Sequence, residues 1–141
     1  GVYMIKIDDD QRTIHLTRGD VTNGKYNKLV FYCPYINTET EEEEEYLFSL
    51  DDKISFVVFE KKGYTKNEIL RKEYTLKELG YTEPTKRPEI PLTDIDTKKF
   101  PLKNKPATYW YDIVLNDNTT VIGYDEDGAS KLIVYPEAEE E

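Results

Sequence analysis

The sequence has only one cysteine, Cys33, and only one histidine, His15. One thiol cannot form a disulfide within the chain, so the sequence leaves the redox compartment undetermined. A structural zinc site takes about four cysteine or histidine ligands, and this count excludes it. A nucleophilic relay would need His15 beside a nucleophile, and no G-x-S-x-G motif is present. We therefore expect no enzymatic activity, no metal and no cofactor, and we predict that His15 is an outward-facing spectator in a strand.

Long apolar runs and an excess of positive charge are also missing. No run of about 18 apolar residues occurs, so we expect no transmembrane helix. Val2 to Ile7 lacks the basic and long apolar regions of a signal peptide, and we expect synthesis in a cytoplasm. The 29 acidic residues outnumber the 19 basic ones, for a formal net charge of -10. This balance argues against nucleic acid and anionic membranes as partners, and it is typical of a soluble, self-repelling surface.

The glycines are scattered, and no phosphate-binding loop of the GxxxxGK[ST] kind is present. Since the sequence also shows no reaction centre, we expect no small-molecule ligand. What the sequence has instead is short runs of β-branched and aromatic residues, helped by 12 tyrosines and 5 phenylalanines. Turn residues such as Asn23-Gly24 separate them. The expected strands are Val2 to Ile7, Arg12 to Leu16, Leu29 to Tyr32, Lys53 to Glu60, Tyr109 to Leu115, Thr119 to Tyr124 and Lys131 to Tyr135.

Lys53 to Glu60 is the clearest of these strands. Ile54, Phe56 and Val58 alternate with Ser55, Val57 and Phe59, and both sets are largely apolar. A strand with two apolar faces is covered on both sides, as at the centre of a sandwich. The strand Leu29 to Tyr32 is expected to end at Pro34, because proline cannot donate a ladder hydrogen bond.

Two segments have mixed patterns. Asn67 to Leu79 fits helical spacing and also fits an alternating strand, and pattern alone does not separate the two. Glu83 to Pro106 contains five prolines, which interrupt regular structure. Within it, Thr93 lies three residues ahead of Asp96, which suits a capped one-turn helix that ends near Phe100.

Three features suggest binding sites, and each has a simpler interpretation. Arg18-Gly19-Asp20 is the tripeptide that integrins recognise, but it follows a strand, where glycine suits a turn. Glu41 to Glu45 indicates an exposed loop or strand edge, because packed like charges are not buried unpaired. Asp125 to Gly128 contains half of a calcium-loop pattern that fails at both ends, so a hairpin turn is the better interpretation.

Four motifs carry a family resemblance when they are taken in order. They are Leu-Thr-Arg-Gly-Asp at Leu16 to Asp20, Asp52 ahead of the I-x-F-x-V strand, Thr-x-x-Asp-Thr at Thr93 to Thr97, and Tyr-x-Tyr-Asp-Ile-x-Leu at Tyr109 to Leu115. The chain resembles small proteins of phage and prophage structural modules. It is similar to the immunoglobulin-like N-terminal domains of baseplate upper proteins and related tail or head-fibre components. The resemblance favours a strand through Tyr74 in the ambiguous segment, with a helical turn at residues 77–79.

The resemblance implies an all-β, immunoglobulin-like β-sandwich of about seven to nine strands with one or two short helical turns. We expect one domain over residues 1–141, with a flexible acidic tail at 136–141. Tyr109, Trp110 and Tyr111 are the expected core and interface anchors. Tyr35 to Glu45 and Lys61 to Asn67 extend the family pattern, and each is a candidate docking loop.

The resemblance also implies a non-enzymatic structural protein of a tailed phage or prophage, located in the virion and assembled in the host cytoplasm. Its expected partners are other phage structural proteins and further copies of itself. The alternative is a carbohydrate-binding or host-surface-binding module that uses exposed tyrosines and Trp110 on one sheet face. An acidic inhibitor that mimics nucleic acid is a further alternative, which rests on charge alone.

Overall fold

The computed structural model describes residues 5–10, 12–23, 27–61, 67–123 and 130–137. The expected all-β, sandwich-like fold is confirmed, and the helix within these ranges is a single short turn. The predicted turn at Asp125 to Gly128 and most of the predicted loop at Lys61 to Asn67 lie outside the described residues. The elements are β1 (Lys6–Ile7), β2 (Ile14–Thr17), β3 (Pro34–Ile36), β4 (Glu43–Glu45), β5 (Lys53–Phe59), β6 (Glu68–Thr75), α1 (Asp94–Thr97), β7 (Ala107–Leu115), β8 (Thr119–Ile122) and β9 (Lys131–Tyr135).

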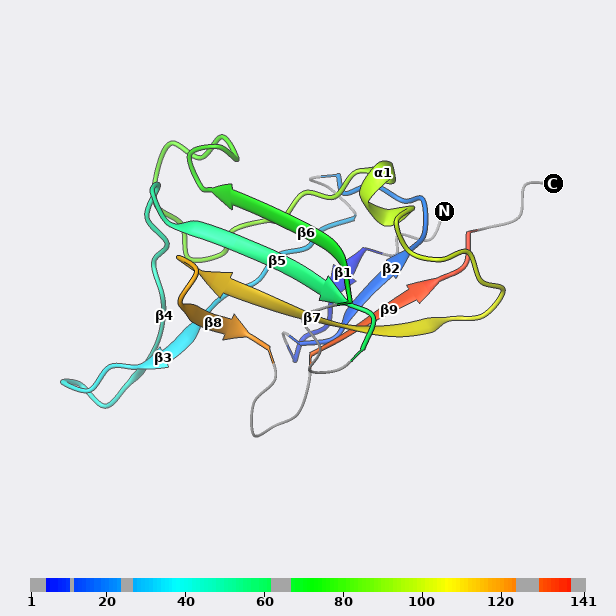
Figure 1. Cartoon of the computed structure of the whole chain (residues 1–141). Coiled ribbons are helices and arrows are strands. Elements are labelled where there is room, and N and C mark those ends of the chain that lie inside the picture. Colours follow the sequence, from blue (N-terminus) through cyan, green and yellow to red (C-terminus); the bar gives the residue numbers. More distant parts are fainter. Residues whose placement is uncertain (1–4, 11, 24–26, 62–66, 124–129, 138–141) are drawn as a thin grey trace.

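Seven strands form one mixed sheet in the order β1-β2-β9-β7-β5-β6, and β8 pairs with β7 (Figure 1). Strand β7 joins the two halves of this sheet. Its first part, 107–110, pairs with β9, and its second part, 110–115, pairs with β5. Strands β2 and β9 run parallel, with Ile14 opposite Leu132. The remaining pairs of this sheet are antiparallel.

Strand β5 behaves as its two apolar faces predict. It lies between β6 and β7, and all of its residues from Ile54 to Phe59 are buried. The inward side chains Ile54, Phe56 and Val58 belong to the main core. Burial of a side chain of this size contributes roughly 1.5–3 kcal/mol to folding.

The second side of the core is built mostly by segments without regular structure. Phe31 and Phe48 are fully buried there and pack edge to face, with ring centroids 5.7 Å apart. Single β-bridges, Val30 to Glu89 and Phe48 to Thr85, hold these segments together. The remaining ordered pair, β3 and β4, forms a separate two-stranded sheet.

The predicted strand at Leu29 to Tyr32 is wrong. Only Val30 makes a bridge there, and the strand β3 begins at Pro34, the residue that was expected to end a strand. Proline is tolerated at this place because it lies at the end of a short edge strand. Glu43 to Glu45 form β4, so the glutamate run lies at a strand edge, one of the two interpretations made from sequence.

The ambiguous segment is a strand, β6, followed by a turn. Gly80 N donates to Lys77 O at 3.1 Å, and the Glu78 carboxylate accepts from Thr75 N at 3.1 Å. The helix α1 starts as predicted, with a capping box in which Thr93 Oγ1 accepts from Asp96 N and Asp96 Oδ2 accepts from Thr93 N. It ends at Thr97, which is earlier than expected.

Candidate docking surfaces

In the described part of the molecule, five of the six exposed large apolar side chains fall in two short segments of the chain. Three lie on or beside β3 and β4, and two lie in the segment around α1 and the loop that follows it. The first group is Tyr35, Ile36 (61% exposed) and Leu47 (53% exposed), and the second is Ile95 and Leu102 (both 72% exposed). Val21 is the remaining one. Exposed apolar side chains concentrated in a short segment make that segment a candidate interaction site.

The first surface is the acidic hairpin, residues 34–47. Strands β3 and β4 pair antiparallel, with Tyr35 opposite Glu44 and Ile36 opposite Glu43. Tyr35 Oη donates to Glu44 Oε2 at 2.7 Å. This hydrogen bond lowers the pKa of Glu44, so the carboxylate stays ionised. The hairpin contains six glutamates and no lysine or arginine, so its exposed apolar side chains sit in a strongly negative field.

An arginine fastens the acidic hairpin to the rest of the fold. Arg87 donates to both carboxylate oxygens of Glu45, from Nε at 2.9 Å and from a terminal nitrogen at 3.1 Å. Its guanidinium also lies 4.6 Å from the centre of the Tyr32 ring. A two-pronged arginine–carboxylate pair fixes orientation as well as distance. This pair therefore fixes the orientation of the hairpin base relative to the rest of the fold.

The second surface is the basic segment, residues 95–105. Lys98, Lys99, Lys103 and Lys105 are exposed, and the sequence has no acidic residue between Asp96 and Asp112. Leu102 lies among these lysines. In a chain with a net charge of -10, this is a local reversal of charge.

Arg18-Gly19-Asp20 has a structural role that sequence reasoning did not identify. Arg18 Nε donates to Phe100 O at 2.8 Å, and a terminal nitrogen donates to Lys98 O at 3.1 Å. Another terminal nitrogen donates to the Glu137 carboxylate. The guanidinium thus holds the backbone of the basic segment in place. Its three acceptors are far away in sequence, so no local signal pointed to them.

The glycine of this tripeptide makes the turn that was expected. Gly19 has a φ of +91°, and its N–H donates to Thr97 Oγ1 at 3.0 Å. Thr97 Oγ1 donates in turn to Asp20 O at 2.8 Å. The tripeptide therefore fastens the end of β2 to the end of α1.

A second clamp holds α1 against the sheet. Lys72 Nζ on β6 lies 3.0 Å from Asp96 Oδ2, and the Asp96 side chain is only 7% exposed. Burial by itself raises the pKa of Asp96, but the hydrogen bond from Thr93 and the Lys72 ammonium outweigh it, and the net shift is downward. The Asp96 carboxylate is therefore ionised. Its pair with Lys72 holds α1, where the basic segment begins, against β6.

An open hollow of about 820 Å³ lies beside the basic segment. Glu60 and residues 101–109 line it, and Leu102, Lys103 and Lys105 are among them. The hollow thus combines an apolar side chain with two ammonium groups and one carboxylate, so its lining carries a net positive charge. Such a surface suits a protruding partner that carries apolar and acidic groups.

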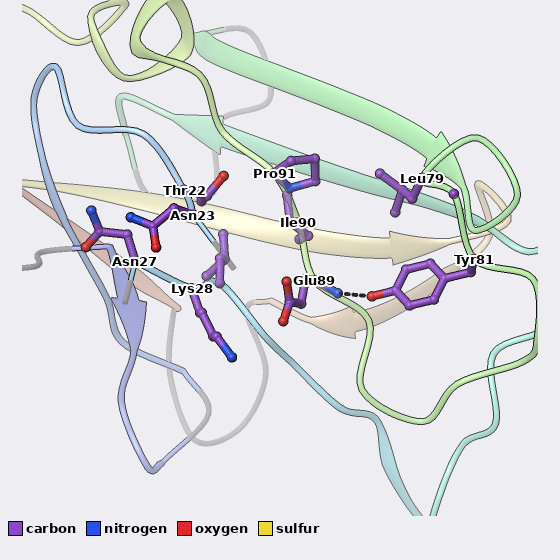
Figure 2. A pocket seen from close by; sticks show the side chains of 11 residues that line it. Thr22, Asn23, Asn27, Lys28, Leu79, Tyr81, Glu89, Ile90 and Pro91 are labelled. Atoms are coloured by element: carbon purple, nitrogen blue, oxygen red, sulfur yellow. Dashed lines mark hydrogen bonds between the residues drawn. The ribbon is translucent and has the colours of Figure 1, made fainter. Parts of the chain in front are cut away.

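A smaller hollow has a volume of about 340 Å³ and is lined by residues 22–23, 27–29, 79–81 and 89–91. Figure 2 shows it from close by. Two of its polar side chains form hydrogen bonds with backbone groups. Tyr81 Oη accepts from Glu89 N at 3.0 Å, and Asn27 accepts from Ile5 N at 3.3 Å and donates to Val21 O at 3.2 Å. The polar groups of these two residues therefore hold the surrounding segments together.

The three predicted anchor residues lie on opposite faces of β7. Tyr109 and Tyr111 are buried in the core, and Trp110 is half-buried between them in sequence. Tyr111 Oη donates to Arg12 O. An interface role for the three stays a prediction. Among the tyrosines in the described ranges only Tyr35 is exposed, so these residues do not form a row of exposed rings for sugar stacking.

His15 lies on the face opposite Ile14 and Leu16, as its alternation predicts, but it is no spectator. Its Nδ1 lies 2.9 Å from Tyr135 Oη, and its Nε2 lies 2.9 Å from Asp8 Oδ2. The rings of His15 and Tyr135 stack with centroids 5.9 Å apart. These contacts link the end of β9 to β2 and to the turn after β1. Neither hollow described above includes His15 among its lining residues.

Within the residues that the structure describes, no group of three histidine, cysteine, aspartate or glutamate side chains is arranged to hold a metal ion. No helix in those ranges is long and apolar enough to cross a bilayer. In comparisons with known proteins, no family model, curated protein or solved structure matches this chain.

Proposed function

We propose that this chain is a non-enzymatic structural protein of a tailed bacteriophage or prophage, a tail or baseplate adaptor that docks onto other virion proteins. The setting rests on the family resemblance of its four ordered motifs. The docking role rests on the two surfaces. Hydrogen bonds and ion pairs fix both surfaces to the rest of the fold, through Arg87 for the hairpin and through Arg18 and Lys72 for the basic segment. Fixed surfaces suit a protein whose role is to bind its neighbours in an assembly.

One observation carries the docking role. Five of the six large apolar side chains that are exposed in the described part belong to the acidic hairpin or to the basic segment. Each surface pairs apolar contact area with a net charge, negative on the acidic hairpin and positive on the basic segment. This combination gives an interface both affinity and orientation.

Purified particles test this proposal. Prophage induction in a strain that encodes the chain, followed by density-gradient purification and mass spectrometry, is expected to find it at a fixed ratio to the tail proteins. An abundant cytoplasmic protein of the same host serves as the control for carry-over. Antibody labelling in electron micrographs is expected to mark the tail or baseplate. Absence of the chain from the particles would contradict the proposal.

A further inference from the structure

The two surfaces lie at opposite ends of the molecule. In Figure 1 the β3–β4 hairpin projects at one end, while the segment between α1 and β7 loops out at the other. One end protrudes and is acidic, and the other is hollowed and basic. We propose that the acidic hairpin of one copy of this chain docks into the hollow beside the basic segment of a second copy. This names a partner for the docking role and rests on that proposed function.

The charges of the two ends complement each other. Glu42 and Glu43 are exposed on the hairpin, while Lys103 and Lys105 are exposed at the hollow. Opposite patches of this kind steer two molecules into one orientation and disfavour the reverse one. Like ends repel, so hairpin does not meet hairpin.

The apolar side chains complement each other as well. Ile36 and Leu47 stand exposed on the protruding hairpin, and Leu102 lies exposed at the hollow. Contact between them removes apolar surface from water on both copies. Charge sets the orientation of the contact, and apolar burial adds to its strength.

The short strands of the hairpin fit the same arrangement. Strands β3 and β4 have three residues each and form a sheet of their own, separate from the seven-stranded sheet. A two-stranded ribbon is marginal in isolation. Here the Arg87–Glu45 pair holds it in position, so the hairpin is presented ready for contact.

The symmetry of the contact has a consequence. It joins two different surfaces and leaves one hairpin and one hollow open at the ends of every pair. A heterologous contact of this kind continues into a ring or an open filament. Repeated copies in a particle would be joined in this way.

Sedimentation velocity on the purified chain tests the proposal. We expect species larger than a dimer to grow with concentration at about 50 mM salt and to weaken at about 500 mM salt, where screening is strong. The variant Lys103→Glu/Lys105→Glu is expected to weaken association about tenfold or more. The matched control Lys28→Glu/Lys77→Glu changes the net charge equally at exposed positions elsewhere, and it is expected to associate like the parent chain.

The hairpin variant Glu42→Lys/Glu43→Lys supplies the second test. It makes the net charge less negative, which by itself favours association, yet we expect it to remain a monomer. Mixed with the Lys103→Glu/Lys105→Glu variant, it is expected to associate again, because the intact hairpin of one variant faces the intact hollow of the other and the two reversed surfaces are again opposite in charge. Circular dichroism checks that both variants keep the β fold.

Three results would overturn the proposal: a parent chain that stays monomeric, one that stops at a dimer, or assembly that both variants leave unchanged. Because the assay uses the purified chain alone, its failure leaves the particle experiment untouched. A chain found in particles that does not self-associate would keep its structural role but take a different partner.

Discussion

Asn116 Nδ2 lies 3.0 Å from Asp52 Oδ1, so the turn between β7 and β8 is fastened to the residue before β5. The other oxygen of Asp52 accepts from Tyr46 Oη and from Ser49 N, both at 2.8 Å. Asn116 takes up a positive φ of 52°, and its Oδ1 accepts from Lys53 N at 2.9 Å. One carboxylate thus joins three segments at one edge of the fold.

We expect Asp52→Ala to lower the free energy of unfolding by about 2–3 kcal/mol, because it leaves several hydrogen-bond donors without a charged acceptor. Urea denaturation followed by tryptophan fluorescence measures the loss. Asp51→Ala is the matched control, since Asp51 is exposed next to Asp52 in the chain. Equal effects of the two substitutions would contradict this role of Asp52.

Asp96→Ala is expected to lower the free energy of unfolding by about 2 kcal/mol, through loss of the capping box and of the partner of Lys72. Asp94→Ala serves as its control within the same helical turn, because Asp94 is exposed. A loss for Asp96→Ala no greater than that of the control would show that the clamp on α1 contributes little.

The stability of the chain should depend on pH through these two carboxylates. Burial raises the pKa of Asp52, but hydrogen bonds from Asn116, Ser49 and Tyr46 outweigh it, and the net shift is downward, as for Asp96. The unfolded chain, with carboxyl groups near the ordinary value of 3.8, then binds more protons than the native chain. Their contribution is therefore present above that value and is lost as pH falls through the lower native pKa.

Comparison of Asp96→Asn with the parent chain isolates this effect. The gap in free energy of unfolding between the two is expected to be largest near neutral pH and to narrow below about pH 4, where Asp96 of the unfolded parent chain takes up a proton before Asp96 of the folded chain does. Urea titrations at a series of pH values measure the gap. A difference in free energy of unfolding that grew as the pH fell would contradict a lowered pKa for Asp96.

Cys33 should react slowly in the folded chain. It is half-buried, and burial raises the pKa of its thiol. Because the thiolate is the reacting form, alkylation by iodoacetamide at about pH 8 is expected to be slower in buffer than in denaturing urea. Mass spectrometry over time gives both rates. Equal rates would place Cys33 in open solvent.

Parts of this fold could be predicted because their signals are local. The two apolar faces of Lys53 to Phe59 predict a central strand, and the structure has one. Thr93 and Asp96 predict a helix start, and the capping box is formed. The strand at Leu29 to Tyr32 failed because a short apolar run only reports burial, and this run is buried without a continuous strand partner.

Of the two docking surfaces, the sequence indicated the acidic hairpin but not the basic segment. The extension from Tyr35 to Glu45 marked the hairpin as a candidate loop, since it departs from the family pattern and is acidic. The basic segment was missed, because its lysines are spread over residues 98–105 between prolines and form no dense run. Its relation to Arg18 depends on backbone carbonyls about 80 positions away.

The sequence by itself determined most of the strands, the start of α1 and the negative net charge. Alternation and capping act over a few neighbouring positions, and the net charge is a sum over the chain. Only the tertiary structure decided the parallel pairing of β2 with β9 and the hydrogen bonds from Arg18 to the carbonyls of Lys98 and Phe100. It also decided the placement of the two charged surfaces at opposite ends. Those relations join residues far apart in the chain. They are selected by how the whole core closes and by which backbone groups are left to be paired.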